Sequence, residues 1–132
     1  MIVDASALVA IIRSEAGAER FAAALEAAST SRMSAANYFE AAIVIDGSRN
    51  ATLSRRLDDV VADASIAIEP VTERQARIAR EAYRDYGKGS GHPAGLNFGD
   101  CFAYALARDT SEPLLFKGGD FAKTDIKSAF GG

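Results

Sequence analysis

Short apolar runs alternate along this chain with longer stretches in which apolar residues recur every three or four positions. The short runs predict strands at residues 1–3, 31–33, 65–69 and 113–116, and a short last strand at 126–130. The longer stretches predict amphipathic helices, because residues three or four apart share one helix face. We place these helices at residues 6–12, 17–28, 35–46, 50–63, 73–86 and 97–109.

Polar residues and glycines mark the ends of several predicted helices. Ser34 and Thr72 each precede a helical stretch, where a hydroxyl accepts an N–H of the first turn. Gly47 and Gly87 follow helical stretches and predict their C-terminal ends. Residues 88–95 are rich in glycine and predict a loop.

Strands that alternate with helices predict an α/β fold. The expected architecture is a three-layer α/β/α sandwich, with a central, mostly parallel sheet covered by helices on both faces. We expect residues 1–132 to form a single domain, since the chain contains no internal repeat and no linker-like segment. In such sheets, ligands bind beyond the carboxyl ends of the strands.

Composition narrows the class of protein without selecting a function. Hydrophobic residues make up 48% of the chain and charged residues 25%, which is typical of a soluble globular protein. The net charge of −3 does not indicate nucleic-acid binding, so phosphate contacts would need a local basic patch. A single cysteine excludes an internal disulfide, and no apolar run could span a membrane. The expected location is therefore the cytoplasm.

Four acidic residues stand where a metal-dependent nuclease would need them. Asp4 follows the first strand and Asp120 lies shortly after the strand at 113–116, so both should reach the carboxyl edge of the sheet. Glu40 lies within a helix, and Asp100 lies in the first turn of another. Carboxylates packed together repel, but a hard divalent cation with oxygen ligands reverses the sign of that interaction.

Each acid also has an explanation that needs no metal. Asp4 is placed to cap the following helix, although Ser6 could cap it instead and leave Asp4 free. Asp100 matches the acidic position of a capping box. Glu40 would be an exposed residue on a solvated helix face, and Asp120 a turn residue after two glycines.

Other polar residues are less informative. We interpret His92 as a solvated loop residue and Cys101 as part of the core. One helix face carries Arg77, Arg80 and Arg84, and we interpret it as solvated, with an RNA-backbone contact as the alternative. Lys117, close to Asp120 in sequence, is the better candidate for a phosphate contact.

Four segments in the same order give the chain a resemblance to a known family. They read MIVDASALVAI, SAANYFEAAIV, LNFGDCFAYALA and PLLFKGGDFAKTDI, and they span nearly the whole chain. The chain resembles PIN-domain ribonucleases and, more narrowly, the VapC-type toxins of bacterial toxin–antitoxin pairs. The acids of that family correspond to Asp4, Glu40, Asp100 and Asp120, and its hydroxyl residue to Ser6.

The chain departs from the family pattern at one place. Many members carry a hydroxyl residue and a further Asn or Asp before the last Asp-Phe pair, where this chain has Phe116 and Gly118. Of the four acids, Asp120 is therefore the least securely assigned.

The resemblance implies an endoribonuclease that hydrolyses RNA phosphodiester bonds at a four-carboxylate site with Mg²⁺, for which Mn²⁺ could substitute. In this interpretation Asp4 and Asp100 are the main metal ligands. Glu40 is a ligand or positions the attacking water, and Asp120 is an outer ligand through water. Ser6 holds a metal-bound water or the substrate phosphate.

The resemblance also implies protein partners. VapC-type toxins are inhibited by a small antitoxin that covers the acidic groove, where an arginine can take the place of metal. Apolar residues such as Phe39, Ile43 and Leu53 would complete that interface, although each could instead belong to the core. Homodimerisation is also common in the family.

Two other functions compete with the nuclease. An aspartyl-phosphate phosphatase also places an aspartate after its first strand, but it needs a second aspartate at the position of Ser6. A PIN-like domain kept as a non-catalytic binding module would not need all four acids.

Overall fold

The computed structural model describes residues 1–131 and contains one parallel four-stranded sheet. Its strand order is β3-β2-β1-β4. The strands are β1 (Ile2–Val3), β2 (Ser31–Ser34), β3 (Ile66–Glu69) and β4 (Leu114–Leu115).

The predicted last strand at 126–130 is wrong. That segment meets the sheet only through an isolated parallel bridge between Leu114 and Ser128. Since β4 is only two residues long, it offers too little edge for a longer ladder.

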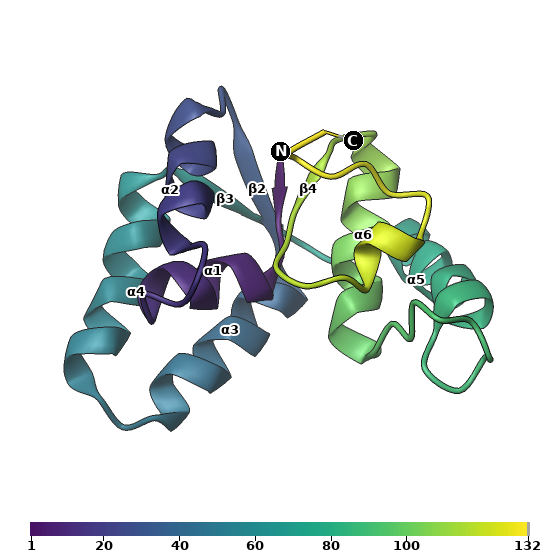
Figure 1. Cartoon of the computed structure of the whole chain (residues 1–132), viewed down its shortest axis with the longest axis horizontal. Helices are drawn as coiled ribbons and strands as arrows, with labels where there is room; N and C mark the ends of the chain where they lie inside the picture. The colour runs from purple at the N-terminus through teal and green to yellow at the C-terminus, as the bar shows by residue number, and fades with distance from the viewer. Residues whose placement is uncertain (132) are drawn as a thin grey trace.

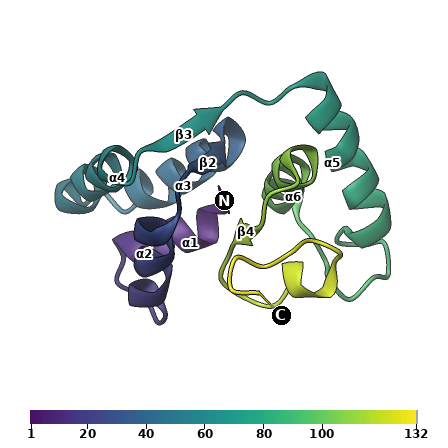
Figure 2. The ribbon, with the colours of Figure 1, turned by 90° about the horizontal axis from the view of Figure 1, so that it is seen from above.

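Six α-helices and one short 3₁₀ helix surround the sheet in the described residues. They are α1 (Ala5–Ile12), α2 (Ala18–Ala27), α3 (Ala35–Gly47), α4 (Ala51–Asp63), α5 (Glu73–Tyr86), α6 (Phe98–Thr110) and η1 (Phe121–Lys123). Figures 1 and 2 show α1 to α4 on one side of the sheet and α5 and α6 on the other. The predicted three-layer α/β/α arrangement is confirmed.

Strands β1 and β4 contribute to both halves of the core although each is only two residues long. Val3 and Leu115 pack into the cluster under α1 to α4, whereas Ile2 and Leu114 pack into the cluster under α5 and α6. Successive side chains of a strand point to opposite faces, so each short strand joins both layers. All four side chains are fully buried, and each stabilises the fold by about 1.5–3 kcal/mol.

Side-chain caps begin the helices largely as predicted. Ser34 accepts the N–H of Ala36 at the start of α3, and Thr72 accepts an N–H at the start of α5. Gly47, however, is the last residue of α3 rather than the stop beyond it. The chain turns at Arg49, which takes the left-handed conformation with φ 56°.

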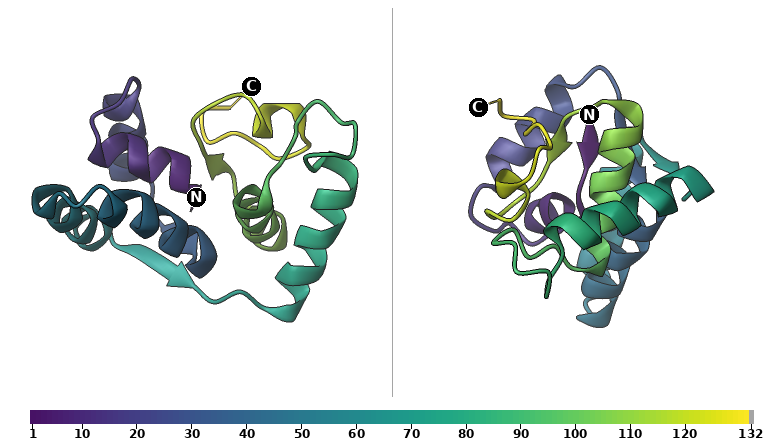
Figure 3. Two further views of the ribbon diagram at one scale, coloured as in Figure 1. Left: turned by 90° about the horizontal axis from the view of Figure 1, so that it is seen from below. Right: turned by 90° about the vertical axis from the view of Figure 1, so that its right-hand side faces the viewer.

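The carboxyl edge of the sheet gathers the starts of three helices. Helices α1 and α3 follow β1 and β2 directly, and α6 begins at the same edge before it runs back toward β4 (Figures 1 and 3). The backbone N–H of Asp4 donates to Leu115 O at 2.9 Å, which fixes the end of β1 against β4. This edge carries the predicted acidic residues.

Candidate functional site

Asp4 is both a helix cap and a buried acid with one unpartnered oxygen. Its Oδ2 accepts the backbone N–H of Ser6 at 3.0 Å and the Ser6 hydroxyl at 2.5 Å. The capping interpretation of Asp4 is confirmed, and the alternative that Ser6 caps α1 is wrong. Asp4 is 3% exposed, yet its Oδ1 is buried without a hydrogen-bond partner. Such an atom is unusual in a folded protein and indicates a place for a donor or a cation.

Ser6 links the first helix to the segment after β4. Its hydroxyl donates to Asp4 and accepts the backbone N–H of Lys117 at 3.0 Å. The Lys117 ammonium pairs with Glu15 at 2.8 Å, on the opposite end of α1 from Asp4. In this structure the Lys117 ammonium is paired with a carboxylate, and its role as a phosphate contact stays a prediction.

Glu40 is held between α3 and α6 and is not an exposed residue of a solvated face. It is half-buried, and its Oε1 accepts from Asn37 Nδ2 at 3.3 Å. The same amide nitrogen donates to Gly99 O at 2.8 Å, so one fully buried side chain ties Glu40 to the start of α6. A Cβ on Gly99 would lie 2.0 Å from Glu40 Oε2, which means that only glycine leaves room for this carboxylate.

The sequence interpretation did not identify Asn37 and Gly99 as site residues. The available signals were weak: an amide one turn before an acidic residue, and a glycine inside a helix start. Neither signal shows that the two residues meet, since they lie 62 positions apart.

Asp100 forms the predicted capping box at the start of α6. Its Oδ2 accepts the backbone N–H of Asn97 at 3.0 Å, and Asn97 Oδ1 accepts the N–H of Asp100 at 2.9 Å. The cap uses one carboxylate oxygen, and the half-buried side chain keeps Oδ1 outside the box. The capping and functional interpretations of Asp100 are therefore compatible.

Asp120 lies at the margin of the group. It is exposed, precedes η1, and makes no side-chain cap for that helix. Gly118 before it has φ 101°, a conformation that favours glycine, so the turn interpretation also applies. The carboxylate still acts on Asp100, whose pKa it helps to raise.

Burial and mutual repulsion disfavour ionisation across the site. Burial raises the pKa of Asp4 to about 6 against the hydrogen bonds from Ser6, and Glu40 raises it further. Burial likewise raises the pKa of Asp100 to about 6, with added repulsion from Asp4 and Asp120. The pKa of Glu40 is also raised, by burial first and by the charge of Asp100. The four acids thus form one electrostatic cluster.

Carboxylate oxygens are the ligands that a hard divalent cation prefers, but in this structure the acidic side chains do not converge on a single point. Within residues 1–131, no three acidic, histidine or cysteine side chains are arranged as a ready-made metal site. Unneutralised carboxylates repel, and Mg²⁺ typically uses one or two carboxylates with several waters and a substrate phosphate. The unpartnered Asp4 Oδ1 beside Asp100 and Glu40 fits that mode of binding.

The structure confirms some of the remaining interpretations of the sequence and contradicts others. Cys101 is buried in the core as predicted. His92 is half-buried and accepts the N–H of Ala94 through Nδ1, so it is structured and not simply solvated. Phe39 and Ile43 are 65% and 56% exposed, which excludes the core alternative for both, whereas Leu53 packs against the core.

Known proteins resemble this chain over nearly its whole length. The family model described as PIN domain matches residues 1–127. Ribonuclease VapC28 of Mycobacterium tuberculosis is 57% identical over 129 residues, which cover 98% of this chain and 97% of the relative. Ribonuclease VapC42 of the same species is 52% identical over 129 residues, covering 98% of each chain.

A solved structure shares the fold at low sequence identity. The crystal structure of Mycobacterium tuberculosis VapC20, described as a toxin that cleaves the sarcin–ricin loop, superposes with a TM-score of 0.73. The match covers 95% of each chain at 15% identity. In the described part of this chain, no helix is both long enough and apolar enough to cross a membrane.

Proposed function

Since this chain belongs to the PIN-domain family and, within it, to the VapC ribonucleases of toxin–antitoxin systems, we propose that it cleaves RNA in a reaction that depends on a divalent metal. Mg²⁺ is the proposed cofactor, and Mn²⁺ fits the same oxygen donors. The observation that carries the proposal is the buried, unpartnered Asp4 Oδ1 within a cluster of mutually repelling carboxylates.

Asp4 and Asp100 would hold the metal. Each keeps one oxygen in a helix cap, through Oδ2 in both residues, and leaves Oδ1 for the ion. The caps orient these carboxylates before any ligand binds, so little side-chain freedom is lost on binding. Asp120, exposed at the margin, would act through water.

The remaining residues position the reactants. Glu40, fixed by Asn37, would orient the attacking water and accept its proton, and burial raises the pKa of its carboxyl in the direction that suits a base. Ser6 holds Asp4 in place through its hydroxyl and connects it to the segment after β4. When bound, the ion supplies an acidified water and neutralises charge at the phosphate.

The partners follow from the family. VapC toxins imply an RNA substrate and a cognate antitoxin. We propose that the antitoxin covers the acidic site and that the exposed Phe39 and Ile43 contribute to its interface. A homodimer and a cytoplasmic location complete the proposal.

Substitution of the acids tests the metal mechanism. Asp4→Asn and Asp100→Asn keep the side-chain volume but remove the charge that holds the ion. We expect each to lower the rate of RNA cleavage in Mg²⁺ at least about 100-fold, or roughly 2.7 kcal/mol in the barrier. Asp58→Asn, an exposed acid on α4, is the matched control and should leave the rate unchanged.

Chelation provides the complementary test. Excess EDTA should abolish cleavage by the unmutated chain, and added Mg²⁺ or Mn²⁺ should restore it. Cleavage that continues at full rate in EDTA would refute metal dependence. A chain that binds RNA without cleaving it in either metal would instead be a non-catalytic module.

A further inference from the structure

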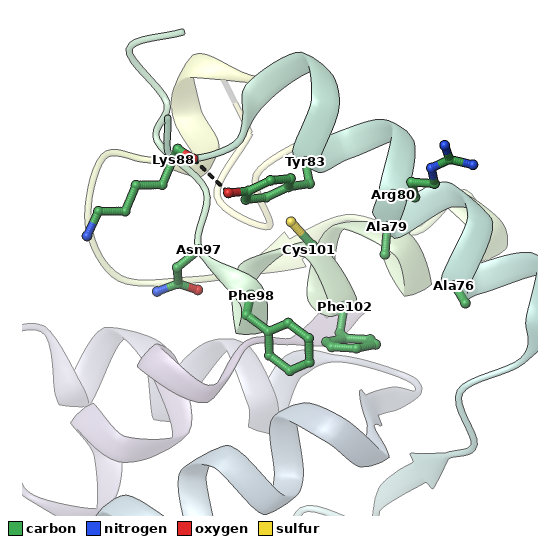
Figure 4. Close-up of a pocket in the computed structure, with 9 residues that line it drawn as sticks. All are labelled: Ala76, Ala79, Arg80, Tyr83, Lys88, Asn97, Phe98, Cys101 and Phe102. Atoms are coloured by element: carbon green, nitrogen blue, oxygen red, sulfur yellow. Dashed lines mark hydrogen bonds between the residues drawn. The ribbon is translucent and has the colours of Figure 1, made fainter. Parts of the chain in front are cut away.

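A groove of about 490 Å³ lies between α5 and α6 on the side of α6 away from Asp100. Figure 4 shows Phe98 and Phe102 side by side on α6, with Tyr83 of α5 across the groove. The small side chains of Ala76 and Ala79 keep its α5 wall open. The groove therefore has flat aromatic walls and room for a planar ligand.

The rings of the groove are unusually exposed. Phe98 is 79% exposed and Tyr83 51%, although large apolar side chains are normally buried. Phe98 meets Phe102 edge to face, with ring centroids 4.9 Å apart. The Tyr83 hydroxyl donates to Lys88 O at 2.9 Å, which fixes both the ring and the start of the following loop. The exposed Phe98 ring, held against Phe102, is a platform on which a planar group can stack.

Positive charge borders the groove. Arg80 and Lys88 line it, and within residues 1–131 neither forms an ion pair. By contrast, Arg77 and Arg84 on the same helix pair with acidic neighbours. Unpaired cations beside an aromatic surface complement a nucleotide, which combines a flat base with an anionic phosphate.

The groove shares the start of α6 with the acidic site. Asn97 lines it and donates its backbone N–H to Asp100, and Phe98 lies two residues before Asp100 on α6. The groove and the carboxylates thus lie on two sides of one helix start, roughly 10 Å apart, the diameter of a helix. A strand with its phosphodiester at Asp100 can place a neighbouring nucleotide in the groove.

From these observations we propose that the groove is a nucleobase subsite, in which a base flanking the cleaved bond stacks on Phe98. The inference rests on the proposed ribonuclease function and names the part of the RNA that this surface recognises. Single-stranded RNA is commonly recognised by bases that stack on aromatic side chains. Arg80 and Lys88 would contact the phosphates on either side of that base.

The test uses short single-stranded RNA oligonucleotides that the chain cleaves and the same oligonucleotides with an abasic ribose at each position flanking the cut. Removal of one base should lower kcat/KM of the unmutated chain about tenfold, the size expected for one stacked base. Phe98→Ala should show nearly the same kcat/KM on intact and abasic RNA. Its side chain is exposed, so the substitution leaves the core intact.

A second variant and two controls separate stacking from general damage. Ala76→Trp fills the groove from α5 and should reproduce the loss on intact RNA, whereas Ala51→Trp on the exposed start of α4 should not. Val71→Ala removes an exposed apolar side chain outside the groove and should retain the abasic penalty. An abasic penalty that persists in Phe98→Ala would overturn the subsite.

Binding measurements distinguish failure of the subsite from failure of the ribonuclease proposal. Fluorescence anisotropy without metal reports RNA affinity whether or not the chain cleaves. If the chain does not cleave RNA but binds abasic RNA more weakly than intact RNA, and Phe98→Ala removes that difference, the ribonuclease proposal is refuted and the subsite is supported. If Phe98→Ala changes the mass in sedimentation and leaves RNA binding and cleavage unchanged, the groove is an interface between copies and the proposal is overturned.

Discussion

At the scale of single residues, the site depends on two uncharged residues that leave space for the Glu40 carboxylate and fix its orientation. Asn37 is fully buried and donates to Glu40 and to Gly99, and the missing Cβ of Gly99 admits the Glu40 carboxylate. Neither residue carries charge, yet together they determine where that carboxylate lies. A small displacement of a positioned group can reduce catalysis far more than it reduces stability.

Gly99→Ala should therefore impair activity without unfolding the chain. The new methyl group would meet only the end of the Glu40 side chain, which can rotate away, and Gly99 lies in ordinary helical backbone. We expect RNA cleavage to fall about 100-fold, while the melting temperature stays within a few degrees. Gly47→Ala is the matched control, since its Cβ would meet nothing within 4 Å. Equal activity of both variants would show that the position of Glu40 does not matter.

At the scale of secondary structure elements, the start of α6 combines a capping role with a role in the site. Asn97 and Asp100 exchange hydrogen bonds in the capping box, and burial with neighbouring charges raises the pKa of Asp100. These two effects oppose each other in the metal-free chain at neutral pH. The capping box stabilises the chain when Asp100 accepts the Asn97 N–H, whereas repulsion from Asp4 and Asp120 disfavours the charged form of Asp100.

Two substitutions separate these effects in thermal melts at pH 7.5 with EDTA. Asn97→Ala removes the cap and should lower stability by about 1 kcal/mol. Asp100→Asn keeps an oxygen that can accept the Asn97 N–H but removes the repelled charge, so it should melt no lower than the unmutated chain. At pH 5, where Asp100 is largely protonated, any gain from Asp100→Asn should disappear. If Asp100→Asn melts as low as Asn97→Ala at pH 7.5, the cap outweighs the repulsion.

At the scale of the whole molecule, the acidic edge links folding to pH and to metal. Asp4 has a folded pKa of about 6 against an ordinary value of 3.8. Its contribution to stability is complete below about pH 3.8 and is lost as the pH rises through about 6. One pKa unit equals about 1.4 kcal/mol, so the loss from Asp4 reaches up to about 3 kcal/mol. Glu112 and Asp125, whose pKa values are lowered, act in the opposite direction at more acidic pH.

The metal-free chain should consequently become less stable between pH 5 and pH 7.5. Added Mg²⁺ or Mn²⁺ should raise the melting temperature at pH 7.5, because a ligand of the native state stabilises it. The same addition should have little effect at pH 5, where protons compete for the carboxylates. Melting curves at both pH values, with and without metal, test this coupling. Asp4→Asn should weaken the dependence of the melting temperature on pH and on metal, and Asp58→Asn should preserve both.

Local signals in the sequence determined the helices, their caps and the three-layer fold. Ser34 and Thr72 cap the helices that their positions predicted, because a cap involves only neighbours within one turn. The predicted strand at 126–130 failed, since a strand depends on the length of the edge it pairs with and not on its own residues alone. The placement of Asp4 and Asp120 at one edge followed from the parallel sheet, whereas Glu40 and Asp100 were assigned to the site by the family resemblance.

Only the tertiary structure decided the details that give the site its chemistry. It pairs Lys117 with Glu15, 102 positions away, and places the Asn37 amide within hydrogen-bond distance of Gly99 O, 62 positions away. It also left Asp4 Oδ1 buried without a partner, while the other oxygen of that residue caps α1. Contacts between distant residues depend on how the layers pack, and no local preference in the chain encodes them. The sequence therefore determined which residues could form a site, and packing decided which of their atoms remain available for a ligand.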